Sequence, residues 1–337
     1  MVQTGDLVDI ESAISNQQRA VNLTPPDHAD LPLWLNDLGV SFKSRFEQTG
    51  DLADIESAIC NFQRAIEFTP LGDAKLPSLL SNLGISFQSR FRWTGNLTDI
   101  ENAISNNQHA VELTPPGHAD LPSKLNNLGG SFRSRFEQTG DLADNESAIS
   151  NFQRAFELTP LGHAKLPLLL DNLGRSFDSR FEQTGDLADI ESAICNFQRA
   201  VALTPSGHAD LPYRLNNLGI SYHSRFNYTQ STEHLDQTIS TFRASATQVI
   251  GSPSLRLQAV KSWAELFPSD TLEAFGIAIQ LLSHIAGLEQ TVHKRHSNLI
   301  DESNLTASAT AAAISAGELN TALEWLEQGR CLVWNQI

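Results

Sequence analysis

The sequence predicts an all-α fold, a solenoid of antiparallel helix pairs that repeat every 45 residues. Two observations carry this prediction. The segment FEQTGDLADIESAICNFQRA stands at residues 46–65 and recurs unchanged at residues 181–200. A Thr-Gly pair recurs every 45 residues, at Thr4, Thr49, Thr94, Thr139 and Thr184. A fixed period of this size is typical of arrays in which each repeat buries its apolar face against the next.

The first helix of each repeat, helix A, is predicted from apolar residues three or four positions apart. Between Leu76 and Phe91 these residues fall on one helix face. A glycine near the middle of helix A, such as Gly39 or Gly84, predicts a close approach of the second helix. A proline in the first turn is tolerated there, because its missing N–H would have no partner in any case. These prolines are Pro32, Pro77, Pro122, Pro167 and Pro212.

The second helix, helix B, spans residues 52–68 in its first complete copy. Apolar residues from Leu52 to Ile66 repeat the helical spacing, and Asp51 is a suitable N-cap. A Thr-Pro pair ends helix B, because proline cannot continue a helix. Each helix alone has a single apolar face, so stacked pairs are needed to bury it. No long segment alternates with a period of two, and we expect no β-sheet.

The repeats divide the chain into two predicted domains. Residues 1–250 form the regular array, which begins in mid-repeat with a helix B at residues 5–24. Complete pairs follow at 31–69, 76–114, 121–159 and 166–204, and a fifth begins at Leu211 with a divergent helix B at 232–249. Residues 251–337 lose the strict period, and we predict degenerate helical repeats that cap the array. Their expected helices are 255–267, 271–288, 308–316 and 319–333.

Composition and charge argue against several classes of partner. Lys and Arg total 23 and Asp and Glu total 39, which gives a net charge of −16. Such a surface repels nucleic acid and anionic membranes and favours a basic or neutral peptide. No apolar run is long enough to span a bilayer, and the N-terminus has no signal-peptide pattern. With three cysteines and no CxxC pair, we expect a cytoplasmic protein without disulfides, zinc or cofactor.

Several residues of the repeat resemble the tetratricopeptide signature of small and large residues. They are Leu35, Leu38, Gly39, Phe42, Ala58, Phe62, Ala65 and Pro70, and the spacing from Ala58 onward matches the 34-residue pattern. Seven extra residues stand between Phe42 and Ala58, so helix A or its turn is expected to be longer. The Leu-Asn-Asn-Leu segments at 125–128 and 215–218 are similar to kinesin light chain repeats. The resemblance implies a right-handed superhelix in which helix A lines a concave groove.

The end of the chain resembles a more specific context. Residues 322–336, ALEWLEQGRCLVWNQ, are similar to the last helix before the caspase-like domain of CHAT proteins, which are large fungal and bacterial proteins. The 45-residue unit with Arg-Phe-x-x-Thr-Gly-Asp-Leu is similar to their arrays as well. The chain stops at Ile337, where that domain would begin, so its catalytic His and Cys have no counterpart here. The resemblance implies a CHAT domain in cis only in a longer product.

No constellation of residues predicts catalysis or metal binding, and we expect a non-enzymatic protein. Cys60 and Cys195 share a helix B position that is serine in other copies, and we expect small buried residues there. Cys331 follows Arg330, but no histidine is paired with it. The loops that join helix B to helix A lie one helix spacing apart, too far to share an ion, so solvated histidines are expected. These are His28, His118, His163 and His208.

An arginine precedes phenylalanine near the end of every helix A. Two interpretations are open, a positive ladder for a partner or an internal ion pair with a carboxylate such as Glu56 or Glu191. We favour the internal pair, or an aliphatic stem packed on the next helix. The residues are Arg45, Arg90, Arg135, Arg180 and Arg225.

Helix A also carries the candidate binding residues. In tetratricopeptide proteins, which the chain resembles, an Asn at this place often holds the backbone of an extended peptide, because a carboxamide both donates and accepts. The alternative is hydrogen bonding between repeats that sets their stacking. The variable position three residues further on includes one cation, Arg175. The candidates are Asp37, Asn82, Asn127, Asn172 and Asn217, with Asn36, Asn126 and Asn216 one position earlier.

These patterns predict a scaffold that docks a peptide or helix of an unknown protein partner in its concave groove. The alternative from another class is the sensor part of a CHAT-type cysteine peptidase whose catalytic domain is absent from this chain. A third alternative is a decaying gene copy without a role.

Overall fold

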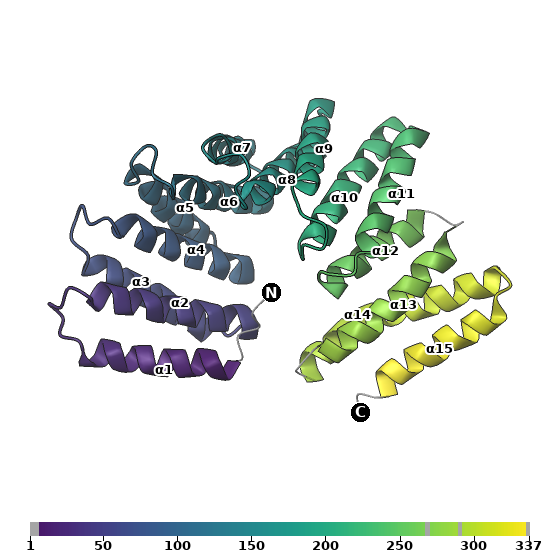
Figure 1. The fold of residues 1–337 in the computed structure, drawn as a ribbon, viewed down its shortest axis with the longest axis horizontal. Helices are drawn as coiled ribbons and strands as arrows, with labels where there is room; N and C mark the ends of the chain where they lie inside the picture. Colours follow the sequence, from purple (N-terminus) through teal and green to yellow (C-terminus); the bar gives the residue numbers. More distant parts are fainter. Residues whose placement is uncertain (1–6, 267–269, 289–291, 335–337) are drawn as a thin grey trace. The chain divides into compact units, whose positions relative to one another are not determined.

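The computed structural model describes residues 7–266, 270–288 and 292–334, and these contain fifteen helices and no strand (Figure 1). The prediction of an all-α helical repeat fold is confirmed. Contacts divide the chain into two compact units, residues 1–180 and 181–337. The boundary expected at residue 250 stays a prediction. Thr4 and the end of the CHAT-like segment, Asn335 and Gln336, lie outside the described residues.

Unit 1 alternates B and A helices, and α3 and α5 each pack on the helix A before and the helix A after them. The seven extra residues lengthen helix A, which has 19 residues where helix B has 16. The unit contains a lone helix B, α1 (Leu7–Leu23), and the pairs α2 (Leu31–Thr49) with α3 (Leu52–Glu67), α4 (Leu76–Thr94) with α5 (Leu97–Glu112), and α6 (Leu121–Thr139) with α7 (Leu142–Glu157). It ends within α8 (Leu166–Thr184).

The turn from helix A to helix B follows from its Thr-Gly-Asp sequence. Gly50 has a φ of 74°, a left-handed conformation that favours glycine, and its N–H donates to the Phe46 carbonyl oxygen at 2.7 Å. The Asp51 carboxylate then accepts from the Ala53 N–H at 3.0 Å and caps α3. The same turn after α10 (Leu211–Thr229) places Gln230 at a φ of 54°, so this copy keeps the geometry without the glycine.

Close approach of the paired helices explains the glycine in the middle of helix A. A Cβ on Gly39 would lie 2.8 Å from the ring of Phe62, and one on Gly129 would lie 2.9 Å from Phe152. Any larger residue would separate helix A from helix B. The glycine prediction is therefore confirmed at both positions.

Unit 2 continues with two regular elements and then departs from the period. Its helices are α9 (Leu187–Ala202), α10, α11 (Thr232–Ala246), α12 (Pro253–Leu266), α13 (Thr271–Leu288), α14 (Val292–Ser315) and α15 (Leu319–Trp334). The expected helix at 308–316 was too short, because α14 begins 16 residues earlier. Buried residues of α11 to α15 form one apolar cluster around the fully buried Trp263.

Candidate functional site

The candidate asparagines form a ladder of hydrogen bonds between successive A helices of unit 1. In each rung, an Asn Nδ2 donates to a side-chain oxygen 46 residues earlier in the chain. The bonds therefore join one repeat to the next, as the stacking alternative expects. The rungs are Asn82 to Asn36 Oδ1 at 2.9 Å, Asn127 to Ser81 Oγ at 2.9 Å and Asn172 to Asn126 Oδ1 at 2.8 Å.

The rungs differ in the hydrogen-bonding capacity that they leave. Asn172 is the most engaged of the three, because its Oδ1 also accepts from Arg133 Nη1 at 3.1 Å. Asn82 and Asn127 are half-buried, and among the described residues their Oδ1 atoms accept no hydrogen bond. Each of these two amides therefore keeps an acceptor and one N–H for another molecule.

The other candidates lie around the ladder or in unit 2. Asp37 accepts from Asn36 Nδ2 at 3.2 Å. The Arg175 side chain is 38% exposed, and its Nη2 lies 3.8 Å from Glu137 Oε1. Asn216 is buried and Asn217 half-buried in α10, and both belong to unit 2.

A cavity of about 740 Å³ opens beside the ladder in unit 1. Its wall includes Asn126 and Asn127, the apolar Leu168 and Leu169, and the loops that precede α6 and α8. Across it, Lys165 Nζ donates to Ser123 Oγ at 2.8 Å. Apolar walls with a few polar groups are typical of a site that takes a side chain or short peptide segment.

A second cavity, of about 260 Å³, lies one repeat earlier and contains a residue that the sequence analysis overlooked. Lys124 is only 8% exposed, and its Nζ donates to Ser78 Oγ at 3.1 Å. Burial lowers the pKa of Lys124, and the nearby Asp120 opposes this shift. The sequence did offer a signal for this residue, because Lys124 is a cation at a repeat position that leucine occupies in the copies before and after it, at Leu79 and Leu169.

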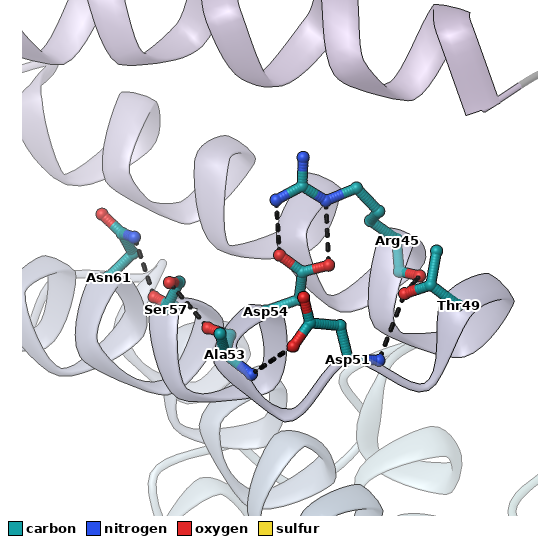
Figure 2. A network of polar contacts seen from close by, with 7 residues as sticks. All are labelled: Arg45, Thr49, Asp51, Ala53, Asp54, Ser57 and Asn61. Atoms are coloured by element: carbon teal, nitrogen blue, oxygen red, sulfur yellow. Dashed lines mark hydrogen bonds and ion pairs between the residues drawn. The ribbon is translucent and has the colours of Figure 1, made fainter.

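The arginine near the end of helix A forms an ion pair within its own repeat, as Figure 2 shows for Arg45. Its Nε and Nη2 bind the two carboxylate oxygens of Asp54 at 2.8 and 2.5 Å, and this bond raises the pKa of Arg45. Asp54 is only 3% exposed. The internal pair is confirmed, although the partner is Asp54 rather than Glu56. Arg90 pairs with Asp99 and Arg135 with Asp144 in the same way.

The last copy of this arginine in unit 2 has a different partner. The residue nine positions after Arg225 is His234, where the earlier copies have aspartate. Arg225 Nη2 instead lies 2.6 Å from Glu191 Oε1 on the preceding helix α9. Glu191 was one of the two carboxylates expected from the sequence, but its pair joins neighbouring repeats.

Cysteines and loop histidines do not form a reactive centre in the described residues. Cys60 and Cys195 are exposed, so the expectation of buried cysteines was wrong. The neighbouring Ile59 is buried because it faces helix A. Cys60 is the next residue of the same helix, so its side chain points away from helix A and toward solvent. His118 and His163 line the same 740 Å³ cavity, but no group of three potential metal ligands occurs in the part of the chain that the structure describes.

None of the described helices has the length and apolar character needed to cross a bilayer.

Residues 213–245, which contain most of α10 and nearly all of α11, match the tetratricopeptide repeat family. No curated protein matches the sequence.

Among solved structures, BtubC (BKLC) from P. vanneervenii is 16% identical, with a TM-score of 0.50 over 73% of this chain and 93% of that chain. The apo form of RapI is 11% identical, with a TM-score of 0.50 over 89% and 97%. A Podosopora anserina putative kinesin light chain with nearly identical TPR-like repeats is 11% identical, with a TM-score of 0.48 over 66% and 99%. The family match and the first two alignments show a helical repeat fold of the tetratricopeptide kind.

Proposed function

We propose that the chain is a non-enzymatic scaffold that binds an extended peptide of another protein along the helix A surface of unit 1. The observation that carries the proposal is the 740 Å³ cavity, in which Asn126 and Asn127 stand beside Leu168 and Leu169. The cavity thus combines amides for a peptide backbone with apolar contacts for a side chain.

The hydrogen-bond ladder supports this role as well as the stacking of repeats. One N–H of Asn82 and of Asn127 is fixed by the neighbouring repeat, which holds the amide in place. The remaining N–H and Oδ1 match the C=O and N–H of any peptide. A preformed site lowers the entropy lost when the peptide binds. The net charge of −16 favours a basic or neutral peptide.

The test uses peptides selected from a random display library against the whole chain, with affinities measured by fluorescence anisotropy. Asn127→Ala and Leu168→Asp should each weaken binding by about tenfold or more, because they remove a polar and an apolar contact. Asn106→Ala is the matched control, since this amide bonds only within α5, to the Asn102 carbonyl. Circular dichroism checks folding. Unchanged binding by folded forms of both site variants would remove the helix A surface as the binding site.

A second candidate is the sensor part of a CHAT-type peptidase. Its support is the CHAT-like segment, which forms the helix α15 as far as Trp334, as the resemblance implies. In that case ligand capture by the repeats would control a catalytic domain in a longer product. The genomic sequence after the codon for Ile337 tests this directly. An in-frame domain with a His and a later Cys supports it, and an immediate stop codon contradicts it.

A further inference from the structure

The 260 Å³ cavity of unit 1 adjoins the 740 Å³ cavity, and the two lie one repeat apart. The loops before α4 and α6 line the smaller cavity, and the loops before α6 and α8 line the larger one. His118 and Asp120 line both, so they stand at the boundary between the cavities. Ligand sites usually measure about 300–1,000 Å³, so the smaller cavity is suited to a single side chain.

Lys124 gives the smaller cavity an ammonium group with unused hydrogen-bonding capacity. Lys124 lines the cavity and is only 8% exposed. One of its three N–H groups donates to Ser78 Oγ at 3.1 Å, and no other partner of this ammonium occurs in the described part of the chain. Two N–H groups therefore remain for an acceptor from another molecule. Stacking does not require a lysine here, because the equivalent residues Leu79 and Leu169 are apolar.

Two carboxylates line the same cavity. Asp73 is half-buried, and its Oδ1 accepts from the Lys75 N–H at 2.8 Å. The exposed Asp120 carboxylate accepts no hydrogen bond within residues 7–266, 270–288 and 292–334. Asp120 is near enough to raise the pKa of Lys124 against the effect of burial, yet no ion pair joins the two among the described residues. His118 Nδ1 accepts from the Asp120 N–H at 3.2 Å, as a neutral imidazole can.

These charges favour a neutral side chain that has both a donor and an acceptor. A carboxylate would accept from Lys124 but would face Asp73 and Asp120 with like charge. A cation would bind the aspartates but would meet the ammonium of Lys124. A carboxamide satisfies both groups, because its oxygen accepts from Lys124 while its NH₂ donates to Asp120.

The spacing of the repeats relates this side chain to the one in the larger cavity. Hydrogen bonds between side chains join α4 to α6 and α6 to α8, so successive A helices pack directly. Packed helices lie about 8–10 Å apart. In a polyproline II peptide, every third side chain lies on the same face, about 9 Å further on. Same-face side chains of a β-strand lie about 7 or 13 Å apart, so the polyproline II spacing is the one that matches.

We propose that the peptide bound by unit 1 has the polyproline II conformation and carries a glutamine or asparagine three residues from a large apolar residue. The carboxamide enters the 260 Å³ cavity between Lys124 and Asp120, and the apolar side chain enters the 740 Å³ cavity against Leu168 and Leu169. The assignment rests on the proposed function, since it places the peptide on the same surface, and it adds the chemical class of the partner.

The test begins with the wild-type chain and a display library of short random peptides. The bound pool should be enriched several-fold in glutamine or asparagine three positions from Leu, Ile, Phe or Met. The most enriched peptide with this spacing is then synthesised, together with forms that carry glutamate or lysine in place of the amide residue. Fluorescence anisotropy measures their affinities. Each charged form should bind about tenfold more weakly or worse, because it meets a like charge and leaves a polar group unpaired.

Two variants of the chain assign these losses to individual charges. With Asp120→Asn, the loss caused by glutamate should shrink by about threefold or more, and with Lys124→Met the loss caused by lysine should shrink likewise. Asp120 makes no side-chain cap to α6, so its exchange leaves the start of the helix intact. Asp30→Asn is the matched control, because Asp30 precedes α2 without a side-chain cap and lines neither cavity. It should leave both losses unchanged, and circular dichroism checks that every variant is folded.

Failure of this assignment can be told from failure of the proposed function. Peptides that bind, and that bind more weakly to Asn127→Ala and Leu168→Asp, but lack the amide at this spacing would overturn the assignment alone. Enrichment of Asp or Glu in place of the amide would do the same, and so would losses that Asp120→Asn and Lys124→Met leave unchanged. A library from which no peptide binds the wild-type chain would overturn both.

Discussion

Two neighbouring helix pairs of unit 1 have the same backbone arrangement but different cores. In α2 and α3, Phe62 lies under Gly39, and in α4 and α5, Asn107 lies under Gly84. Both Phe62 and Asn107 are fully buried, at 0% exposure for each. A Cβ on Gly39 would lie 2.8 Å from the Phe62 ring, and one on Gly84 would lie 2.7 Å from the Asn107 Oδ1.

The difference shows what maintains the repeat geometry. Asn107 Nδ2 donates to Ser131 Oγ at 3.0 Å, but its Oδ1 is buried without a partner. An unpaired buried polar atom costs about 1–3 kcal/mol. The pair keeps its close approach because the glycine and the turns define the backbone, and because the repeats on either side stabilise it. Asn145, at a position that is isoleucine in most copies, has the same defect.

The largest expected effect on stability comes from replacing the buried Phe62 of the α2–α3 pair with asparagine, the residue found at the equivalent position of the α4–α5 pair. Phe62→Asn should destabilise α2 and α3 by about 3–5 kcal/mol, because it removes a buried ring and leaves a cavity. Native-state amide hydrogen exchange of these helices measures the loss, since a repeat array need not unfold in one step. The matched control is Gln63→Ala, on the exposed side of the same helix. A loss below about 1 kcal/mol would show that Phe62 contributes little to the pair.

The reverse exchange should stabilise the polar pair. Asn107→Phe removes the unpaired Oδ1 and buries apolar surface, for a gain of about 2 kcal/mol. The ring should fit because Ser131, the hydrogen-bond partner of Asn107, corresponds to Ser86, which occurs in the repeat after Phe62. Slower hydrogen exchange in α4 and α5 is the expected readout. Faster exchange would mean that this core has adapted to the smaller side chain.

The period made most of unit 1 predictable from the sequence. Each turn, cap and glycine recurs in several copies, so an assignment at Gly39 or Asp51 is repeated at 45-residue intervals. The start of α14 was not predictable, because residues 292–307 have no apolar spacing that marks a helix. The exposure of Cys60 was missed because residue type alone suggested burial, whereas helical phase from Ile59 would have placed it outward.

The candidate site shows a different limit of the sequence. Asn82 and Asn127 were identified from position, but the sequence could not decide between a peptide and the neighbouring repeat as their partner. The ladder depends on the offset of helix A between repeats, which places Asn127 beside Ser81 rather than beside Asn82. That offset is a property of packing and has no signature in a single repeat.

Lys124 is a polar residue in an otherwise apolar position, and the pH dependence of stability tests its effect on the core. Lys124→Leu should stabilise α4 and α6 by about 1 kcal/mol near neutral pH, because a buried ammonium is replaced by the residue found in equivalent copies. The pKa of Lys124 is lowered from its ordinary 10.5, so in alkali the folded state loses its proton first. Wild-type stability should therefore rise, relative to the variant, as pH increases toward 10.5.

Urea unfolding of both proteins between neutral pH and about pH 10 measures this difference. Lys75→Leu is the control, because it replaces an exposed lysine with the same residue. A difference between wild type and Lys124→Leu that is constant with pH would contradict a buried, perturbed ammonium.

The smallest expected effect concerns the arginine pairs of the two units. His234→Asp places in α11 the carboxylate that Asp54 provides in α3, so Arg225 should gain a partner in its own repeat. The gain should be only about 0.5 kcal/mol, because Arg225 already binds Glu191 and exposed pairs contribute little. A double-mutant cycle isolates the exchange of partners, with stability measured by hydrogen exchange in α10 and α11. Glu191→Gln should lower the stability of wild type more than that of His234→Asp. Equal losses would show that Arg225 remains paired with Glu191 whether position 234 is histidine or aspartate.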